Sequence, residues 1–259
     1  MKTTQGMFSE AFIDRVAKEH GVDQQHLPSK DEIERRTSEQ AQQAIARKRI
    51  KVYAAMSVWP GGNIPLHFQF SSWQVDKQDN HELAKALGKQ AYQLAIRMEK
   101  TPLNVIMSGD KGTGKTSLAL AIMDYLSDKG QSGMFVSTAE LANLIGQQYE
   151  LSDVKNRLVR IERAMRETDV LILDDFGTEG GMKQDIKPVR RDMQALMYRV
   201  ANGRVNFEMN AAKKSTIITT NNSVSELKAM YNDKLISRLV PKPASQQLAF
   251  LNMKDVRGI

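Results

Sequence analysis

Residues 108–117 read SGDKGTGKTS and place three glycines and two lysines directly after the apolar run LNVIM at 103–107. Gly109, Gly114, Lys115 and Thr116 fit the pattern G-x-x-x-x-G-K-[ST]. Glycines let such a loop turn so that its backbone N–H groups point inward and hold a phosphate, and a helix that begins there adds its positive dipole end. The pattern predicts that Lys115 contacts the β- and γ-phosphates and that the Thr116 hydroxyl binds Mg²⁺. The alternative, a glycine-rich turn with an incidental lysine, does not require this place between a strand and a helix.

A second motif, DVLILDDFG at 169–177, is an apolar strand that ends in two carboxylates. Strands of an open parallel sheet deliver their carboxyl-terminal residues to the ligand crevice. Asp174 is therefore expected to hold Mg²⁺, directly or through water, and Asp175 to polarise the attacking water as general base. A capping pair in a turn is the alternative. The two motifs together predict a nucleoside triphosphate site.

Two further residues are weaker candidates for the same chemistry. Asn221 follows the strand pattern TIITT at 216–220 and is a candidate for orienting the attacking water, although a strand-end turn explains it equally well. Arg238 lies in NDKLISRLV, where an arginine is commonly a surface residue. In an oligomeric ATPase, such an arginine instead enters the neighbouring subunit's site and neutralises transition-state charge.

The elements that must position these residues alternate from Leu103 onward. Helices are predicted from Lys115 to about Lys129 with Gly130 as the stop, after Pro188 to near Gly203, and from Ser223 with Glu226 in capping-box register. Short strands separated by helices predict an α/β fold with a mostly parallel five-stranded sheet covered on both faces. The apolar runs expected to form it are 103–107, 134–136, 170–173, 216–220 and 248–251.

The first hundred residues have a different character. A long polar helix is predicted over 29–57, opened by a capping box of Ser29 and Glu32, and it is either a solvated helix or a docking helix for a partner. WPGGNIP at 59–65 then indicates a linker. A helix over 81–99 follows, with Leu83, Leu87, Leu94 and Met98 on one side. We expect a helical region at 1–58, a connector at 59–80 and an ATPase domain at 81–259.

Composition narrows the class of protein. The chain has 259 residues, 41% of them hydrophobic, a net charge of +7 and no cysteine, which excludes disulfides and thiolate metal sites. No apolar stretch is long enough for a membrane span, and the N-terminus does not read as a secretory signal, so a cytoplasmic location is expected. Positive charge concentrates in ARKRIK (46–51), KPVRR (187–191) and KK (213–214). This distribution suits a partner rich in phosphates.

The stretch from NVIMSGDKGTGKTS to NLIGQQYE (104–150) resembles the ATPase module of the bacterial replicative helicase loaders, the DnaC/DnaI family of AAA+ proteins. NIPLHFQFSSWQV is similar to the connector of that family, and FLNMKDVRG is similar to its closing segment. The resemblance covers about residues 60–259. Transposition helper ATPases of the IstB type share the same motifs. Only about twenty residues follow Arg238, which leaves little room for the helical lid of larger AAA+ machines.

The resemblance implies roles for individual residues. Asp174 and Asp175 correspond to Walker B, Asn221 to sensor 1, Arg238 to the arginine finger and Arg257 to sensor 2, which touches the γ-phosphate. Asp175 stands where many AAA+ proteins carry Glu, so slow turnover is expected. ATP and Mg²⁺ are the implied cofactors. The residues implied to form the Walker A nucleotide site are Gly109, Asp110, Lys111, Gly112, Thr113, Gly114, Lys115, Thr116 and Ser117.

The family also implies binding of single-stranded DNA through a helical insert, here within about 139–168. Tyr149 lies where an aromatic ring would stack on a base. Because Leu141, Leu144, Ile145 and Tyr149 fall on one helical face, a core position for Tyr149 is slightly favoured. The arginines expected to follow the phosphate backbone, unless they form a solvated face, are Arg157, Arg160, Arg163 and Arg166.

Three functions are compatible with these features. The first is an ATP-dependent loader that places a hexameric replicative helicase on single-stranded DNA, docks through its N-terminal helices and self-associates through its ATPase domains, with ATP acting as a switch. The second is an IstB-like transposition helper that binds duplex DNA. The third is a nucleotide-binding adaptor with little hydrolysis. A bacterial cell is the expected setting, and the gene is expected on a chromosome or a phage.

Overall fold

The computed structural model describes residues 15, 18–19, 30–62, 64–181 and 185–257. The chain divides into two units, residues 1–45 and 46–259. The long polar helix is present as α2 (Lys30–Ala54), and its Ile33 and Ile45 side chains are exposed. Acidic residues in its first turn and Lys51 in its last suit the helix dipole. The predicted capping residue Ser29 lies outside the described residues.

In the described part of the chain, the main sheet has five parallel strands in the order β2-β3-β6-β1-β7. The register pairs Ile106 with Ile218 and Phe135 with Ile172. All residues of β3 and β6 are buried, as expected for parallel strands covered on both faces. The predicted fold class is confirmed. The strands are β1 (Asn104–Gly109), β2 (Gly133–Ser137), β3 (Val170–Asp174), β6 (Ser215–Thr220) and β7 (Gln247–Phe250).

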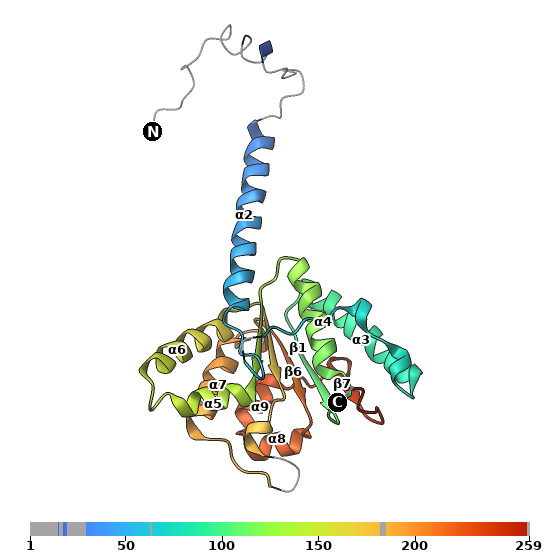
Figure 1. Ribbon diagram of the computed structural model, residues 1–259. Helices are drawn as coiled ribbons and strands as arrows, with labels where there is room; N and C mark the ends of the chain where they lie inside the picture. Colours follow the sequence, from blue (N-terminus) through green and yellow to red (C-terminus); the bar gives the residue numbers. More distant parts are fainter. Residues whose placement is uncertain (1–14, 16–17, 20–29, 63, 182–184, 258–259) are drawn as a thin grey trace. The chain divides into compact units, whose positions relative to one another are not determined.

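Helices cover both faces of the sheet and make three layers (Figure 1). One face packs against α3 (His81–Lys100) and α4 (Lys115–Asp128), with Leu87, Leu94 and Met98 of α3 buried. The other face packs against the remaining helices, and the predicted capping box of Ser223 and Glu226 opens one of them. These are α5 (Thr138–Gln147), α6 (Ser152–Glu167), α7 (Arg191–Gly203), α8 (Val224–Met230) and α9 (Asp233–Leu239).

A small hairpin, β4 (Val205–Asn206) with β5 (Ala211–Ala212), was not predicted. Two residues per strand are too few for an alternation pattern to register in the sequence. The turn depends instead on local polar contacts, because Asn206 Oδ1 accepts hydrogen bonds from the backbone of Glu208 and Met209. The hairpin joins α7 to the central strand β6.

Residues 55–80, between α2 and α3, pack against the sheet and α3. Val58 forms an isolated parallel bridge with Val136, and the ring of Trp59 stacks on Phe135 at 4.3 Å. Trp73 donates a hydrogen bond from Nε1 to the carbonyl of Ala84 at 3.0 Å. The segment predicted to be a connector therefore contributes large side chains to the wall of this unit. The division into a docking region, a connector and an ATPase domain stays a prediction.

Arg204 ties together the amino-terminal ends of β3 and β6. Its guanidinium is fully buried and donates to the carbonyls of Met165 at 2.7 Å and Thr168 at 2.9 Å, and also to Ser215. Burial lowers the pKa of Arg204 to about 9, so the group still carries its charge at neutral pH. A buried cation is tolerated here because several carbonyl oxygens solvate it in place of water.

Asp169, beside Arg204, carries a pH dependence of stability. Its burial alone would raise its pKa, but hydrogen bonds from Lys214 and Ser132 lower the pKa of Asp169 to about 2. A carboxyl whose folded pKa is depressed contributes stability above its unfolded pKa and loses it as pH falls toward the folded value. We therefore expect Asp169 to contribute about 2 kcal/mol at pH 6, lost between about pH 4 and pH 2.

Urea titrations of the wild type and Asp169→Asn across this pH range measure the effect. The difference in unfolding free energy between the two proteins should be largest near pH 6 and should shrink as the solution is acidified. A difference that stays constant down to about pH 2.5 would show that the carboxylate charge is not what matters at this position.

Candidate functional site

The glycine-rich loop joins the end of β1 to the start of α4, as predicted. Gly109, Gly112 and Gly114 all have positive φ values (144°, 73° and 97°), which side chains other than glycine rarely adopt. Space is also restricted at all three: a Cβ on Gly109 would lie 2.6 Å from the Phe250 carbonyl, one on Gly112 would overlap the Asp255 carboxylate, and one on Gly114 would lie 2.7 Å from the Trp73 ring. The loop conformation therefore depends on glycine at these positions.

Lys115 begins α4 and is only 5% exposed. Its Nζ donates to the carbonyls of Gly109 at 2.9 Å and Asp110 at 2.6 Å. No carboxylate of the described residues lies within ion-pair distance of this ammonium group. Burial lowers the pKa of Lys115, which means that the charged form lacks full compensation inside the protein. An anion held by the loop would supply that compensation.

Asp174 ends β3 and is held by two threonines. Thr116 Oγ1 and Thr219 Oγ1 each donate to Asp174 Oδ1 at 2.7 Å. Burial raises the pKa of Asp174 to about 6, because the two hydroxyls offset only part of the loss of solvent. A cation beside Oδ1 would stabilise the charged form. Thr116 and Asp174 thus adjoin each other as the sequence predicts for a Mg²⁺ site.

Asp175 is the first residue of the turn after β3. Its backbone has φ +51°, a left-handed conformation that Asp and Asn tolerate better than most residues. The turn is fixed because the Asp175 N–H donates to Thr219 Oγ1 at 2.9 Å. Thr219 therefore holds the Asp174 carboxylate and the Asp175 backbone, a role that the sequence did not single out although Thr219 lies in TIITT. The Asp175 side chain is exposed and lines the cavity described next.

A cavity of about 420 Å³ lies over the glycine-rich loop. The predicted Asp175, Asn221 and Arg257 line it together with loop residues from Lys111 to Ser117. Asn221 is notable because its Oδ1 is buried without a hydrogen-bond partner in the described structure. Sequence reasoning missed a second wall, which comes from the segment before α3 and consists of Phe68, Ser72, Trp73, Gln74, Lys77 and Gln78.

Trp73 forms the central part of this wall. Its indole fits between two glycines, because a Cβ on Gly88 of α3 would lie 2.8 Å from the ring and one on Gly114 would lie 2.7 Å from it. The aromatic residues of HFQFSSW were visible in the sequence, but no spacing rule connects them to a loop about forty residues away. The contact gives the cavity an apolar side opposite its cationic floor, as ligand pockets commonly have.

Trp73 also provides a reporter for occupancy of the cavity. We expect Mg²⁺–ATP to change the tryptophan fluorescence of the wild type in a saturable manner and to leave Trp73→Phe almost without signal. Trp59 serves as the internal control, because it stacks on Phe135 and does not line the cavity. A saturable change that survives in Trp73→Phe would place the ligand elsewhere.

The closing segment of the chain covers the glycine-rich loop. Val256 N–H donates to the Gly112 carbonyl at 3.1 Å, and Arg257 pairs with Asp255 at 2.6 Å. Gln78 exchanges two hydrogen bonds with the backbone of Lys254, at 2.9 and 3.0 Å. These contacts place Arg257 at the cavity, where the prediction requires it.

Arg238 does not line the cavity. Its guanidinium lies over the rings of Tyr198 at 4.8 Å and Phe207 at 5.5 Å, and its carbonyl accepts a hydrogen bond from Asn104. A residue that acts in the neighbouring subunit's site is expected to lie away from its own, so its role as an arginine finger stays a prediction.

The slightly favoured core position of Tyr149 is wrong. Helix α5 ends at Gln147, so Tyr149 does not continue its apolar face; the side chain is 71% exposed and its hydroxyl donates to Asp192 at 3.1 Å. The arginines of α6 are all exposed, as a solvated face would be. Arg157 and Arg160 line a hollow beside Met56, whereas Arg163 pairs with Glu167 at 2.8 Å. Contact of these residues with DNA stays a prediction.

Comparisons with known proteins identify a family of ATP-binding proteins. Residues 21–240 match the family described as IstB-like ATP binding protein. The putative ATP-binding protein of insertion sequence IS21 from Pseudomonas aeruginosa is 29% identical over 58% of this chain and 50% of its own length. The replicative helicase loader DnaC of Buchnera aphidicola is 24% identical over 67% of this chain and 63% of its own length. The matched region thus spans half to just under two thirds of these relatives.

Among solved structures, a DNA replication initiation factor aligns with 70% of this chain and 50% of its own, at a TM-score of 0.51 and 16% identity, which supports the fold alone. In the described part of the chain, no helix is long and apolar enough to cross a membrane. The resemblance to helicase loaders and IstB-type ATPases inferred from the motifs is confirmed. Since the family match extends over most of its length and includes the glycine-rich loop and Asp174, the chain belongs to the IstB-like ATP-binding proteins.

Proposed function

We propose that this protein is an ATP-dependent loader that places a hexameric replicative helicase on single-stranded DNA. The observation that supports it most is the contact of Thr116 with Asp174 beside Lys115, at the edge where β1, β6 and β3 end. A buried ammonium without a carboxylate partner and a buried carboxylate with a raised pKa suit a triphosphate with its Mg²⁺. The helicase as partner is taken from the relatives that are named as replicative helicase loaders.

Each residue then has a distinct task. Lys115 and the loop N–H groups bind the phosphates, while Thr116 and Asp174 hold Mg²⁺, which neutralises phosphate charge when bound. Asp175 accepts the proton of the attacking water, and Asn221 uses its unpaired Oδ1 to orient that water. The short side chain of Asp175 keeps turnover slow. Trp73 and Phe68 cover the base of the nucleotide, since they supply the apolar wall.

The nucleotide acts as a switch between assembly states. Arg257 contacts the γ-phosphate from within the same chain, and Arg238 contacts it from the neighbouring chain. Loss of the γ-phosphate removes both contacts and weakens the interface between neighbours. In the single chain, the Arg238 guanidinium lies over the rings of Tyr198 and Phe207. To contact a neighbour's nucleotide, the side chain moves away from these rings.

A transposition helper that coats duplex DNA is the second candidate, favoured by the 29% identity to the IS21 protein. Affinity for single-stranded and duplex DNA of equal length, measured at fixed salt with Mg²⁺–ATP, separates the two. A loader should prefer the single strand by at least tenfold. Preference for the duplex would favour the helper function instead.

Docking to the helicase is assigned to residues 1–45, which include the first part of α2, residues 30–45. Residues 46–58 should be kept in any truncation, because Arg49 pairs with Asp169 and Val58 bridges Val136. We expect a purified hexameric helicase to retain the full chain in a pull-down and to lose a chain that lacks residues 1–45. The full-length Ile33→Glu/Ile45→Glu variant changes only exposed residues and should also be lost. Retention of both would contradict docking through this region.

A further inference from the structure

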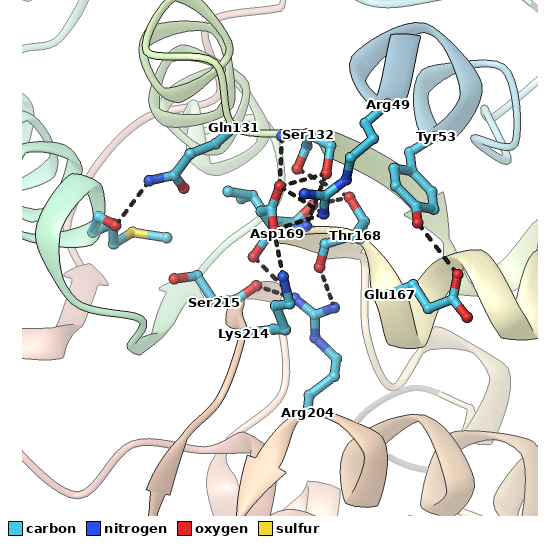
Figure 2. Close-up of polar contacts among 12 residues, drawn as sticks. Arg49, Tyr53, Gln131, Ser132, Glu167, Thr168, Asp169, Arg204, Lys214 and Ser215 are labelled. Carbon is cyan, nitrogen blue, oxygen red and sulfur yellow. Dashed lines mark hydrogen bonds and ion pairs between the residues drawn. The ribbon is translucent and has the colours of Figure 1, made fainter. Parts of the chain in front are cut away.

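Two basic segments far apart in the sequence meet at the edge of the sheet opposite the nucleotide cavity. Arg49, from ARKRIK, donates to Asp169 at 3.1 Å, and Lys214, from KK, pairs with the same carboxylate (Figure 2). Asp169 precedes β3 and Lys214 precedes β6. The strands are parallel, so their amino-terminal ends share this edge and the nucleotide cavity lies at their other ends.

Two adjoining hollows lie at this edge, of about 450 and 270 Å³, and both are lined by Lys213 and Lys214. We call them together the basal groove. Its basic lining residues are Arg49, Lys100, Arg166, Lys213 and Lys214.

The acidic residues of the basal groove are already engaged. Asp169 is bound by Ser132 as well as by Lys214 and Arg49. Glu167 accepts from Arg163 at 2.8 Å and from the Tyr53 hydroxyl at 3.3 Å, and Glu99 accepts from the Tyr125 hydroxyl at 3.0 Å. Basic side chains therefore compensate the charges of Asp169 and Glu167, whereas the Tyr125 hydroxyl leaves the charge of Glu99 in place.

Three of the basic residues remain without such partners. Lys100, Arg166 and Lys213 are exposed, and none has a carboxylate within ion-pair distance in the described part of the chain. They lie on three different elements: the end of α3, the last turn of α6 and the loop before β6. The groove is lined by five basic residues and three carboxylates, and three of the basic residues have no carboxylate partner, so it presents net positive charge to a partner.

The frame that holds these cations is rigid. Arg204 binds the carbonyls of Met165 and Thr168 through its guanidinium, and its own carbonyl accepts the backbone N–H of Lys213 at 2.8 Å. Figure 2 shows this guanidinium beneath Thr168 and Asp169. These bonds fix the backbone beside Arg166 and at Lys213 before a ligand arrives, so only the exposed side chains have to be ordered on binding.

We propose that the basal groove binds the phosphodiester backbone of a DNA strand. Cations spaced along a groove suit a polymer in which phosphates recur, and backbone contacts of this kind carry no sequence preference. The proposal takes its partner, DNA, from the proposed function, but it assigns a surface that is distinct from both the nucleotide cavity and the face of α6 around Arg157 and Arg160. A strand bound here also contacts Arg49 at the base of α2, and so reaches the end of the docking helix.

The test is fluorescence anisotropy of a labelled 20-nucleotide strand with the full chain at graded salt. The groove variant is Lys100→Gln/Arg166→Gln/Lys213→Gln, which leaves the pairs of Arg49 and Lys214 intact. Affinity falls as salt rises, and loss of three phosphate contacts should make the slope of log affinity against log salt less negative by about 2. It should also lower the affinity by about 10- to 100-fold near 0.1 M salt. The matched control, Lys85→Gln/Lys89→Gln/Lys234→Gln, changes net charge equally at exposed lysines elsewhere and should lose less than threefold.

The outcomes separate the groove from the function. If the wild type binds DNA and the groove variant binds equally well, or if the control loses as much affinity, the groove proposal fails and the proposed function stands. If the wild type binds neither a single strand nor a duplex, both fail. Unchanged melting temperature and Mg²⁺–ATP affinity show that the groove variant is folded. The same anisotropy measurement with a duplex of equal length shows whether the groove binds single-stranded or double-stranded DNA.

Discussion

Lys115→Ala should abolish nucleotide binding at ordinary concentrations. The wild-type ammonium is buried and is satisfied only by the carbonyls of Gly109 and Asp110, so a phosphate is the missing anionic partner. Truncating a charged hydrogen-bond donor at such a site costs about 2–5 kcal/mol, which corresponds to roughly 30- to 5,000-fold in affinity. Equilibrium binding of a fluorescent ATP analogue with Mg²⁺ measures the loss.

The control is Lys129→Ala, at the other end of the same helix, where the side chain is exposed. It should change affinity by less than twofold. Lys115→Arg adds a stricter comparison, because it keeps the charge but has to fit a larger group into a site that is 5% exposed, and it should also bind poorly. Affinity for ATP retained in Lys115→Ala would remove the phosphate-binding role from this loop.

Asp175→Asn should stop hydrolysis while nucleotide binding persists. Loss of a general base costs about 10²- to 10⁴-fold in rate. The backbone is expected to stay in place, because Asn tolerates the φ of +51° and the hydrogen bond from the backbone N–H to Thr219 does not involve the side chain. Steady-state phosphate release and ATP affinity, measured on one preparation, give both quantities.

Asp174→Asn is the comparison that separates the two carboxylates. It keeps an oxygen to accept from Thr116 and Thr219 but removes the negative charge, so it should weaken the Mg²⁺ dependence of nucleotide binding. If Asp175→Asn hydrolyses ATP as fast as the wild type, Asp175 is not the base. If the wild type itself hydrolyses no faster than this variant, the adaptor function gains support.

The parts of the site that the sequence predicted are those whose chemistry is local. Gly109 to Thr116 form one continuous motif, and Asp174 follows an apolar strand whose direction in a parallel sheet decides where it points. The order β2-β3-β6-β1-β7 then brings these ends together. Local patterns were sufficient here because the turn of the glycine-rich loop and the direction of a buried strand decide where these side chains lie.

The parts that were missed depend on contacts across long stretches of chain. Trp73 reaches the cavity only because Gly88 and Gly114 both lack a side chain. Thr219 was passed over for Asn221, since a strand residue's contact with Asp174 depends on the sheet register. The face of Tyr149 was misjudged because the predicted helical face extends two residues beyond the end of α5 at Gln147. None of these contacts leaves a periodic signal in the sequence.

Titration calorimetry of the full chain with ATP, with and without Mg²⁺, tests the nucleotide site most directly. We expect one saturable binding event per chain, at least tenfold tighter with Mg²⁺, and a loss of this Mg²⁺ effect in Asp174→Asn. Absence of saturable heat in the presence of Mg²⁺, or equal binding with and without the metal, would contradict a triphosphate site built from Lys115, Thr116 and Asp174.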